Sequence, residues 1–161
     1  MRQPLPDVVA VVLGGVAFVA VALLRGSGTA ALVVGAVSVP LVLSDVRQRL
    51  LPNALTVPVV LAGAAEAITS GGGAVPAVLA TAVVLGALHL VGGLGMGDVK
   101  LGIGLAFPLA DAGPLEVLAA PALAFLLGGL WALPLVLSGD RARIPFGPFQ
   151  LAAFWIVLSV P

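Results

Sequence analysis

The chain has 161 residues, of which 61% are hydrophobic and 9% are charged, and its seven basic and seven acidic side chains leave no net charge. Soluble domains carry roughly 25% charged residues, so this composition excludes an ordinary soluble globular domain. The absence of cysteine excludes disulfides, thiolate catalysis and cysteine-ligated zinc. With so few basic residues, nucleic acid is not an expected partner.

Helix breakers and charged residues divide the chain into seven apolar segments, which we predict to be helices. In chain order they cover residues 8–24, 29–44, 54–69, 75–91, 99–109, 115–137 and 149–160. Several approach or exceed the roughly 18 residues of a membrane-span candidate, whereas the fifth is long enough for only about half of a bilayer core. The sequence therefore predicts an all-α, polytopic membrane bundle with six to seven spans, forming a single domain over residues 1–161.

Polar residues stand at the start of three of these segments. Thr29, Asn53 and Asp98 are of the residue types that favour helix N-caps. Each of them is therefore a candidate N-cap for the helix that follows it.

Basic residues in the short connections predict the orientation, because positively charged loops stay in the cytoplasm. If all seven segments cross, one side of the membrane holds Arg2, Lys100 and the basic residues of the connections at 47–49 and 141–143. Only Arg25 falls on the other side. The pattern predicts a cytoplasmic N-terminus.

Two aspartates stand out among the charged residues. Asp45 ends the second segment and Asp98 opens the fifth, so the predicted topology places both on the cytoplasmic side at about the same depth. Two carboxyl groups held close together cannot both ionise easily. The ionised member can activate water as a general base while the protonated member acts on a scissile amide. The pair thus indicates aspartic hydrolysis.

Each aspartate also has a simpler interpretation. Asp98 could cap a helix, and Asp45 could pair with Arg47 or Arg49. The glycines at positions 92, 93, 95 and 97 favour the hydrolytic interpretation, because they are predicted to prevent a stable helix and to let an extended peptide approach Asp98.

His89, inside the fourth segment, has no matched partner at helical spacing. We expect it to face the bundle and to bond a backbone carbonyl or a hydroxyl group.

Three motifs resemble those of the type IV prepilin peptidase family, which are polytopic intramembrane aspartic peptidases. Asp45 followed by Leu51-Pro52-Asn53 is similar to the first catalytic block of that family. The stretch Gly95-Met96-Gly97-Asp98-Val99-Lys100-Leu101 is similar to the second, and Ile144-Pro145-Phe146-Gly147-Pro148-Phe149 resembles the element that opens the last helix. The motifs occur in the order that the family shows.

The resemblance implies cleavage of a short basic leader from prepilins or pseudopilins, whose hydrophobic helix lies in the lipid bilayer. Asp45 and Asp98 would be the catalytic pair, at the cytoplasmic face of the bacterial inner membrane. No cofactor, metal or covalent intermediate is implied. Only seven residues precede the first segment and cysteine is absent, so the chain resembles the short, peptidase-only form, for which methyl transfer is not expected.

The remaining motif residues have architectural and site-shaping roles in this interpretation. Pro52 and Asn53 are expected to shape and cap the third helix. Lys100 is expected to hold a carboxylate or a substrate carbonyl, or alternatively to extend its amine to the membrane interface. The loop of Pro145, Phe146, Gly147 and Pro148 is expected to be rigid and to line the substrate entrance.

Two other functions fit the same residues. A small proton-coupled transporter would use Asp45 and Asp98 to bind protons or cations, although transporter sites usually lie near the bilayer midplane. A non-catalytic membrane subunit of a secretion or pilus assembly would keep the fold without needing either aspartate. The sequence indicates no oligomeric state.

Overall fold

The computed structural model describes residues 5–73, 75–139 and 144–160, and this part of the chain is all α-helical. Seven helices follow one another along it: α1 (Leu5–Leu24), α2 (Thr29–Gln48), α3 (Asn53–Thr69), α4 (Val75–Leu90), α5 (Met96–Ala110), α6 (Pro114–Leu137) and α7 (Gly147–Ser159). Each predicted apolar segment corresponds to one helix. The predicted fold class is confirmed.

The ends of two helices differ from the prediction at the aspartates. α2 continues beyond Ser44 to Gln48, so that Asp45 lies inside the last turn. α5 begins at Met96, which makes Gly97 helical and Asp98 the third residue of the helix. The prediction that the glycines prevent a helix holds for the connection before Met96 and is wrong for Gly97.

The prediction of three N-caps is wrong. The cap positions belong to Gly28, Pro52 and Gly95, and none of the three helices has a side-chain cap bond from its own cap residue. Glycine and proline adopt the extended backbone that a cap position needs. The predicted polar residues therefore lie in the first turn of each helix and not at its cap.

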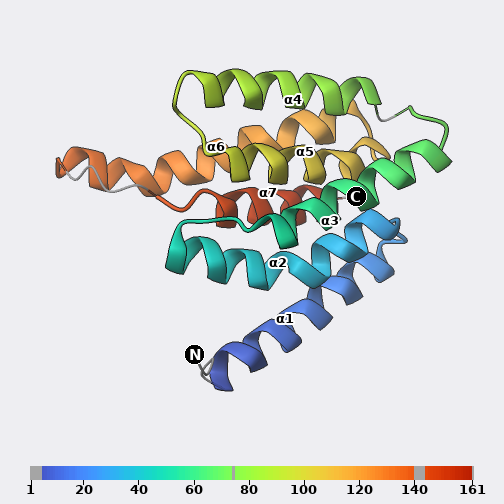
Figure 1. Cartoon of the computed structure of the whole chain (residues 1–161), viewed down its shortest axis with the longest axis horizontal. Coiled ribbons are helices and arrows are strands. Elements are labelled where there is room, and N and C mark those ends of the chain that lie inside the picture. Colours follow the sequence, from blue (N-terminus) through green and yellow to red (C-terminus); the bar gives the residue numbers. More distant parts are fainter. Residues whose placement is uncertain (1–4, 74, 140–143, 161) are drawn as a thin grey trace.

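Three helices are long and apolar enough to cross a membrane, with spans at Asp7–Leu24, Thr29–Gln48 and Pro114–Leu137. α3, α4 and α7 are shorter apolar helices. The 15-residue α5 lies at the centre of the bundle, where it packs against α2, α3, α4, α6 and α7 (Figure 1). A helix surrounded by protein does not need to match the thickness of the lipid, because its neighbours shield it. This position accounts for the short fifth segment.

The helix ends that carry the sequence motifs lie at one end of the bundle. Figure 1 shows the α2–α3 and α4–α5 connections at the left, together with the start of α1, the end of α6 and the start of α7. The α1–α2, α3–α4 and α5–α6 connections lie at the opposite end. Arg2, Arg141 and Arg143, on which the predicted orientation partly depends, lie outside the described residues.

Small residues let helices approach closely where they cross. A Cβ at Gly35 of α2 would stand 3.0 Å from the backbone nitrogen of Val19 in α1, and one at Gly104 of α5 would stand 2.8 Å from Cγ1 of Val59 in α3. Close backbone approach of this kind provides helix association in membranes, where burial of apolar side chains provides little.

α3 supplies the cap that α2 lacks. Glu66 Oε2 accepts hydrogen bonds from the backbone N–H of Ala30 at 2.7 Å and from the hydroxyl of Thr29 at 3.3 Å. The carboxylate thereby satisfies a free N–H of the first turn and faces the positive end of the α2 dipole. Glycine at position 28 leaves room for this contact, because a Cβ there would overlap the Glu66 carboxylate in its present position.

We expect Glu66→Ala to destabilise the fold by about 1 kcal/mol, the usual cost of removing an N-cap acceptor. In detergent this corresponds to an apparent Tm lower by about 2–4 °C. Glu66→Gln keeps one acceptor oxygen, so its apparent Tm should fall by less than that of Glu66→Ala. Asp111→Asn, an exposed charge change at the C-cap of α5, serves as the control. Equal Tm values for Glu66→Ala and wild type would contradict the capping role.

Candidate active site

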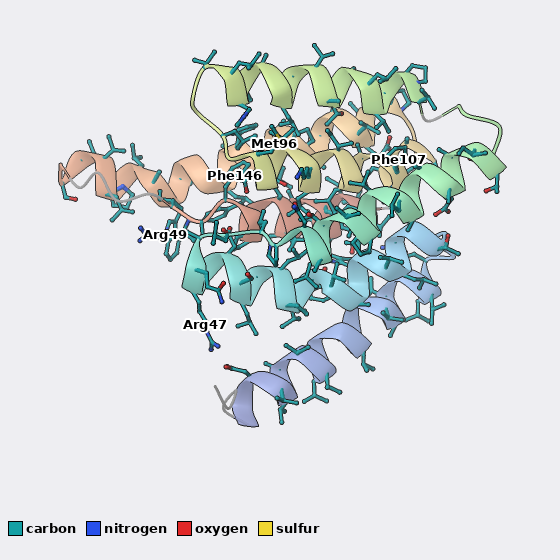
Figure 2. The ribbon with its side chains drawn as sticks, in the orientation of Figure 1. Arg47, Arg49, Met96, Phe107 and Phe146 are labelled. Carbon is teal, nitrogen blue, oxygen red and sulfur yellow. The ribbon has the colours of Figure 1, made fainter. Side chains whose placement is uncertain are left out.

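A groove of about 670 Å³ opens at the end of the bundle where the motifs meet. It is lined by the last turn of α2, the α4–α5 connection, the start of α5, one face of α6 and the residues before α7. Figure 2 shows Arg49, Met96 and Phe146 at this end and Phe107 at the other. The groove is lined by Asp45, Arg49, Gly92, Gly93, Leu94, Gly95, Asp98, Phe125, Gly128, Gly129, Ala132, Ile144, Pro145 and Phe146.

Asp45 lines one wall of this groove and is only 5% exposed. Its Oδ2 accepts a hydrogen bond of 2.8 Å from the backbone N–H of Gly147, the first residue of α7. A hydrogen bond to a buried carboxyl group holds it in one orientation and offsets part of the cost of burying it.

The two arginines near Asp45 do not pair with it. Arg47 forms a double hydrogen bond with Asp7 of α1, at 2.5 and 2.6 Å. Arg49 ends α2 in the left-handed conformation, with φ of 53°, and lines the groove. The structure therefore does not support the alternative interpretation in which Asp45 forms a salt bridge with its neighbours. The interaction of Asp7 with Arg47 was not predicted.

Asp98 lies on the other wall, in the first turn of α5. Like Asp45, it lines the groove, so the two aspartates face the same space from different helices. The main-chain oxygen of Asp98 accepts a hydrogen bond of 3.2 Å from Nε2 of Gln150 in α7. Since the cap position of α5 belongs to Gly95, the side chain of Asp98 is not the N-cap that the alternative interpretation required.

Contacts between α3 and α5 join the first and second motifs. Nζ of Lys100 donates a hydrogen bond of 3.0 Å to Oδ1 of Asn53. A Cβ at Gly97 would stand 2.9 Å from Cβ of Leu51, so that glycine allows the two segments to touch. The described bond of the Lys100 amine is thus to Asn53 and not to an aspartate, and Asn53 bonds this lysine instead of capping α3. Pro52 occupies the cap position.

The third motif completes the groove. Pro145 and Phe146 line it, and the ring of Phe146 packs against Phe125 of α6 with centroids 4.9 Å apart. Pro148 lies in the first turn of α7, where proline is tolerated because its missing N–H is not needed. Gly147 is buried beside Asp45.

His89 supports the glycine-rich wall. Its Nδ1 lies 2.8 Å from the carbonyl oxygen of Leu94. The expected bond to a backbone carbonyl is confirmed. It connects the end of α4 to the connection that leads into α5.

Sequence reasoning missed several residues of this region. Gln150 was not considered, although a buried amide in an otherwise apolar helix is the type of polar residue that requires explanation in a membrane protein. Arg49 was considered as a partner for Asp45 and as an orientation signal, but not as a residue of the groove. The α6 face formed by Phe125, Gly128, Gly129 and Ala132 gives no signal in the sequence, because it differs little from the rest of an apolar helix.

Two carboxyl groups facing one groove are suited to acid–base activation of water, because one can accept a proton while the other donates one. Among the described residues, no group of three or more histidine, aspartate and glutamate side chains lies together in a geometry that could hold a metal ion.

Comparison with known proteins identifies the family. The sequence model of the type IV leader peptidase family matches residues 32–133, which is more than half of the chain and includes both Asp45 and Asp98. The third motif lies beyond the matched residues. No curated protein and no solved structure matches the chain. Because this match covers most of the helical bundle, the chain belongs to the type IV leader peptidase family.

Proposed function

We propose that the protein is an intramembrane aspartic endopeptidase that removes the short basic leader of type IV prepilins or pseudopilins. The observation that supports this proposal most directly is the position of Asp45 and Asp98, which come from different helices and line one groove at one end of the bundle. Cleavage would take place at the cytoplasmic face of the bacterial cytoplasmic membrane. The family match supports peptidase activity, and the substrate and the side of the membrane belong to the proposal.

In the proposed reaction, one aspartate is ionised and the other is protonated. The ionised carboxylate removes a proton from a water molecule, whose oxygen attacks the carbonyl carbon of the scissile peptide bond. The protonated carboxyl group donates a hydrogen bond to the carbonyl oxygen. The C–N bond then breaks, and the amine of the new N-terminus takes a proton from the carboxyl pair.

The position of the groove is appropriate for such a substrate. It lies where α2 ends and where α5 and α7 begin, so it opens at the end of the bundle and not in its middle. A prepilin whose hydrophobic helix lies in the bilayer would present the junction between helix and leader at this depth. Under the positive-inside rule, the basic leader would remain on the cytoplasmic side.

The same position does not favour transport. Transporter sites are usually built on broken helices near the bilayer midplane. Here Asp45 and Asp98 lie within one helical turn of a helix end. Transport and a non-catalytic assembly role therefore remain as outcomes of the tests that follow.

We expect Asp45→Asn and Asp98→Asn each to reduce leader removal by at least about 100-fold, because an amide can neither accept nor donate the proton that the reaction transfers. The measurement is the N-terminal mass of a prepilin incubated with purified enzyme in detergent. Asp111→Asn, which changes the same chemical group outside the groove, should cleave like wild type. Cleavage by both groove variants at the wild-type rate would favour an assembly role or transport.

The rate of cleavage should show a bell-shaped dependence on pH. At low pH both carboxyl groups are protonated and the base is lost, whereas at high pH both are ionised and the acid is lost. The two apparent pKa values then belong to the pair. Initial rates across the pH range, with circular dichroism to verify folding at each pH, provide the test. A flat profile for a folded enzyme would contradict the mechanism.

We expect Gly147→Ala to reduce cleavage by about tenfold or more. The new Cβ would stand 2.9 Å from Oδ2 of Asp45 and 3.2 Å from Cδ2 of Leu51, so the carboxyl group would have to move away from its present position. Gly86→Ala in α4 is the matched control, because its Cβ would meet no atom within 4 Å and Gly86 does not line the groove. An equal loss of cleavage in both variants would indicate a general packing defect and contradict the specific role of Gly147.

A further inference from the structure

The first turn of α7 contacts both aspartates of the groove. The backbone N–H of Gly147 donates to Oδ2 of Asp45 at 2.8 Å, and Nε2 of Gln150 donates to the main-chain oxygen of Asp98 at 3.2 Å. Residues three apart share one face of a helix. One turn of α7 is therefore bonded to the side chain of an α2 residue and to the backbone of an α5 residue.

Gln150 is unusual for its surroundings. It is 5% exposed and is the only amide or charged side chain in α7. Its Oε1 has no hydrogen-bond partner among the described residues. A buried amide that satisfies only one of its two ends is less favourable than an apolar side chain of the same size. Stability therefore does not explain a glutamine at this position.

Gln150 is not among the residues that line the groove. It lines a second, apolar cavity of about 20 Å³, together with Thr81 and Leu85 of α4 and residues of α5 and α6. Phe125 and Phe146 lie between the two, because they line both. Any effect of Gln150 on the reaction must therefore act through Asp98.

We propose that the first turn of α7 fixes the position of the two aspartates relative to each other, with Gln150 as the positioning residue for Asp98. This inference rests on the proposed function, and it concerns residues outside the segment that the family model matches. Gly147 holds the carboxyl group from α2, and Gln150 holds the first turn of α5 from the same helix face.

The reaction needs an accurate separation between the two carboxyl groups, because both must reach the same peptide bond. A displacement of about 1 Å in a reacting group can lower a rate by roughly 100-fold. α7 packs against both α2 and α5, so a single rigid element can set their separation. Loss of the Gln150 bond would remove the hydrogen bond that joins the first turn of α5 to α7, leaving the bond from Lys100 to Asn53 of α3 and the packing of the helix.

The test uses Gln150→Leu and Gln150→Met, which keep the size of the side chain and remove the donor. Because Gln150 does not line the groove, we expect kcat for prepilin cleavage to fall at least about tenfold while KM stays within about twofold. Hydrogen exchange of the backbone amides at residues 99–102 should become at least about threefold faster, since the first turn of α5 loses its anchor. Measuring both variants keeps the test valid if one of them does not fold.

Thr81→Val is the matched control. Thr81 is equally buried and lines the same small cavity, but its hydroxyl bonds only the Ala77 carbonyl of its own helix. It should leave kcat and the exchange at residues 99–102 unchanged. The same loss of kcat in Thr81→Val and in the Gln150 variants would show a packing effect and overturn the proposal.

The two proposals fail in distinguishable ways. If wild type does not cleave prepilins but exchange at residues 99–102 rises in the Gln150 variants, the peptidase proposal fails and the anchoring of α5 stands. If wild type cleaves and both Gln150 variants retain its kcat within twofold, the positioning role is wrong and the peptidase proposal stands.

Discussion

The hydrogen bond from the backbone of Gly147 to the buried carboxyl group of Asp45 connects the last helix of the bundle to the second. A carboxyl group placed among apolar helices needs such a partner, because burial without one is costly. The partner must be an N–H with no bond inside its own helix, and the first residue of α7 supplies it. The third motif is thereby brought against the first, and the groove forms between them and the start of α5.

Much of this arrangement was predictable from the sequence. Long uncharged segments between glycines, prolines and charges indicated seven helices, since an apolar run in a chain of this composition has few other structures available. Asp45 and Asp98 were matched by depth alone, from the alternation of helices across a membrane. That reasoning predicted two carboxyl groups at one end of the bundle, where both line one groove. Their catalytic role remains a proposal.

The parts that were not predictable depend on contacts between segments far apart in the chain. Local capping rules assigned Asn53 and Asp98 to N-caps, but Pro52 and Gly95 hold those positions, and Asn53 bonds Lys100 from another helix. Glu66 caps a helix 36 residues before it. Such bonds leave no periodic pattern in the sequence, because each depends on how two helices happen to cross.

In the proposed mechanism, a peptide is cut between Asp45 and Asp98 in this groove. The decisive measurement is a structure of the Asp45→Asn variant bound to an uncleaved prepilin. We expect the peptide to lie extended along the α4–α5 connection at residues 92–95, with the carbonyl carbon of the leader junction between the substituted side chain at position 45 and the carboxyl group of Asp98. A prepilin bound elsewhere on the bundle, with the groove closed or empty, would contradict it.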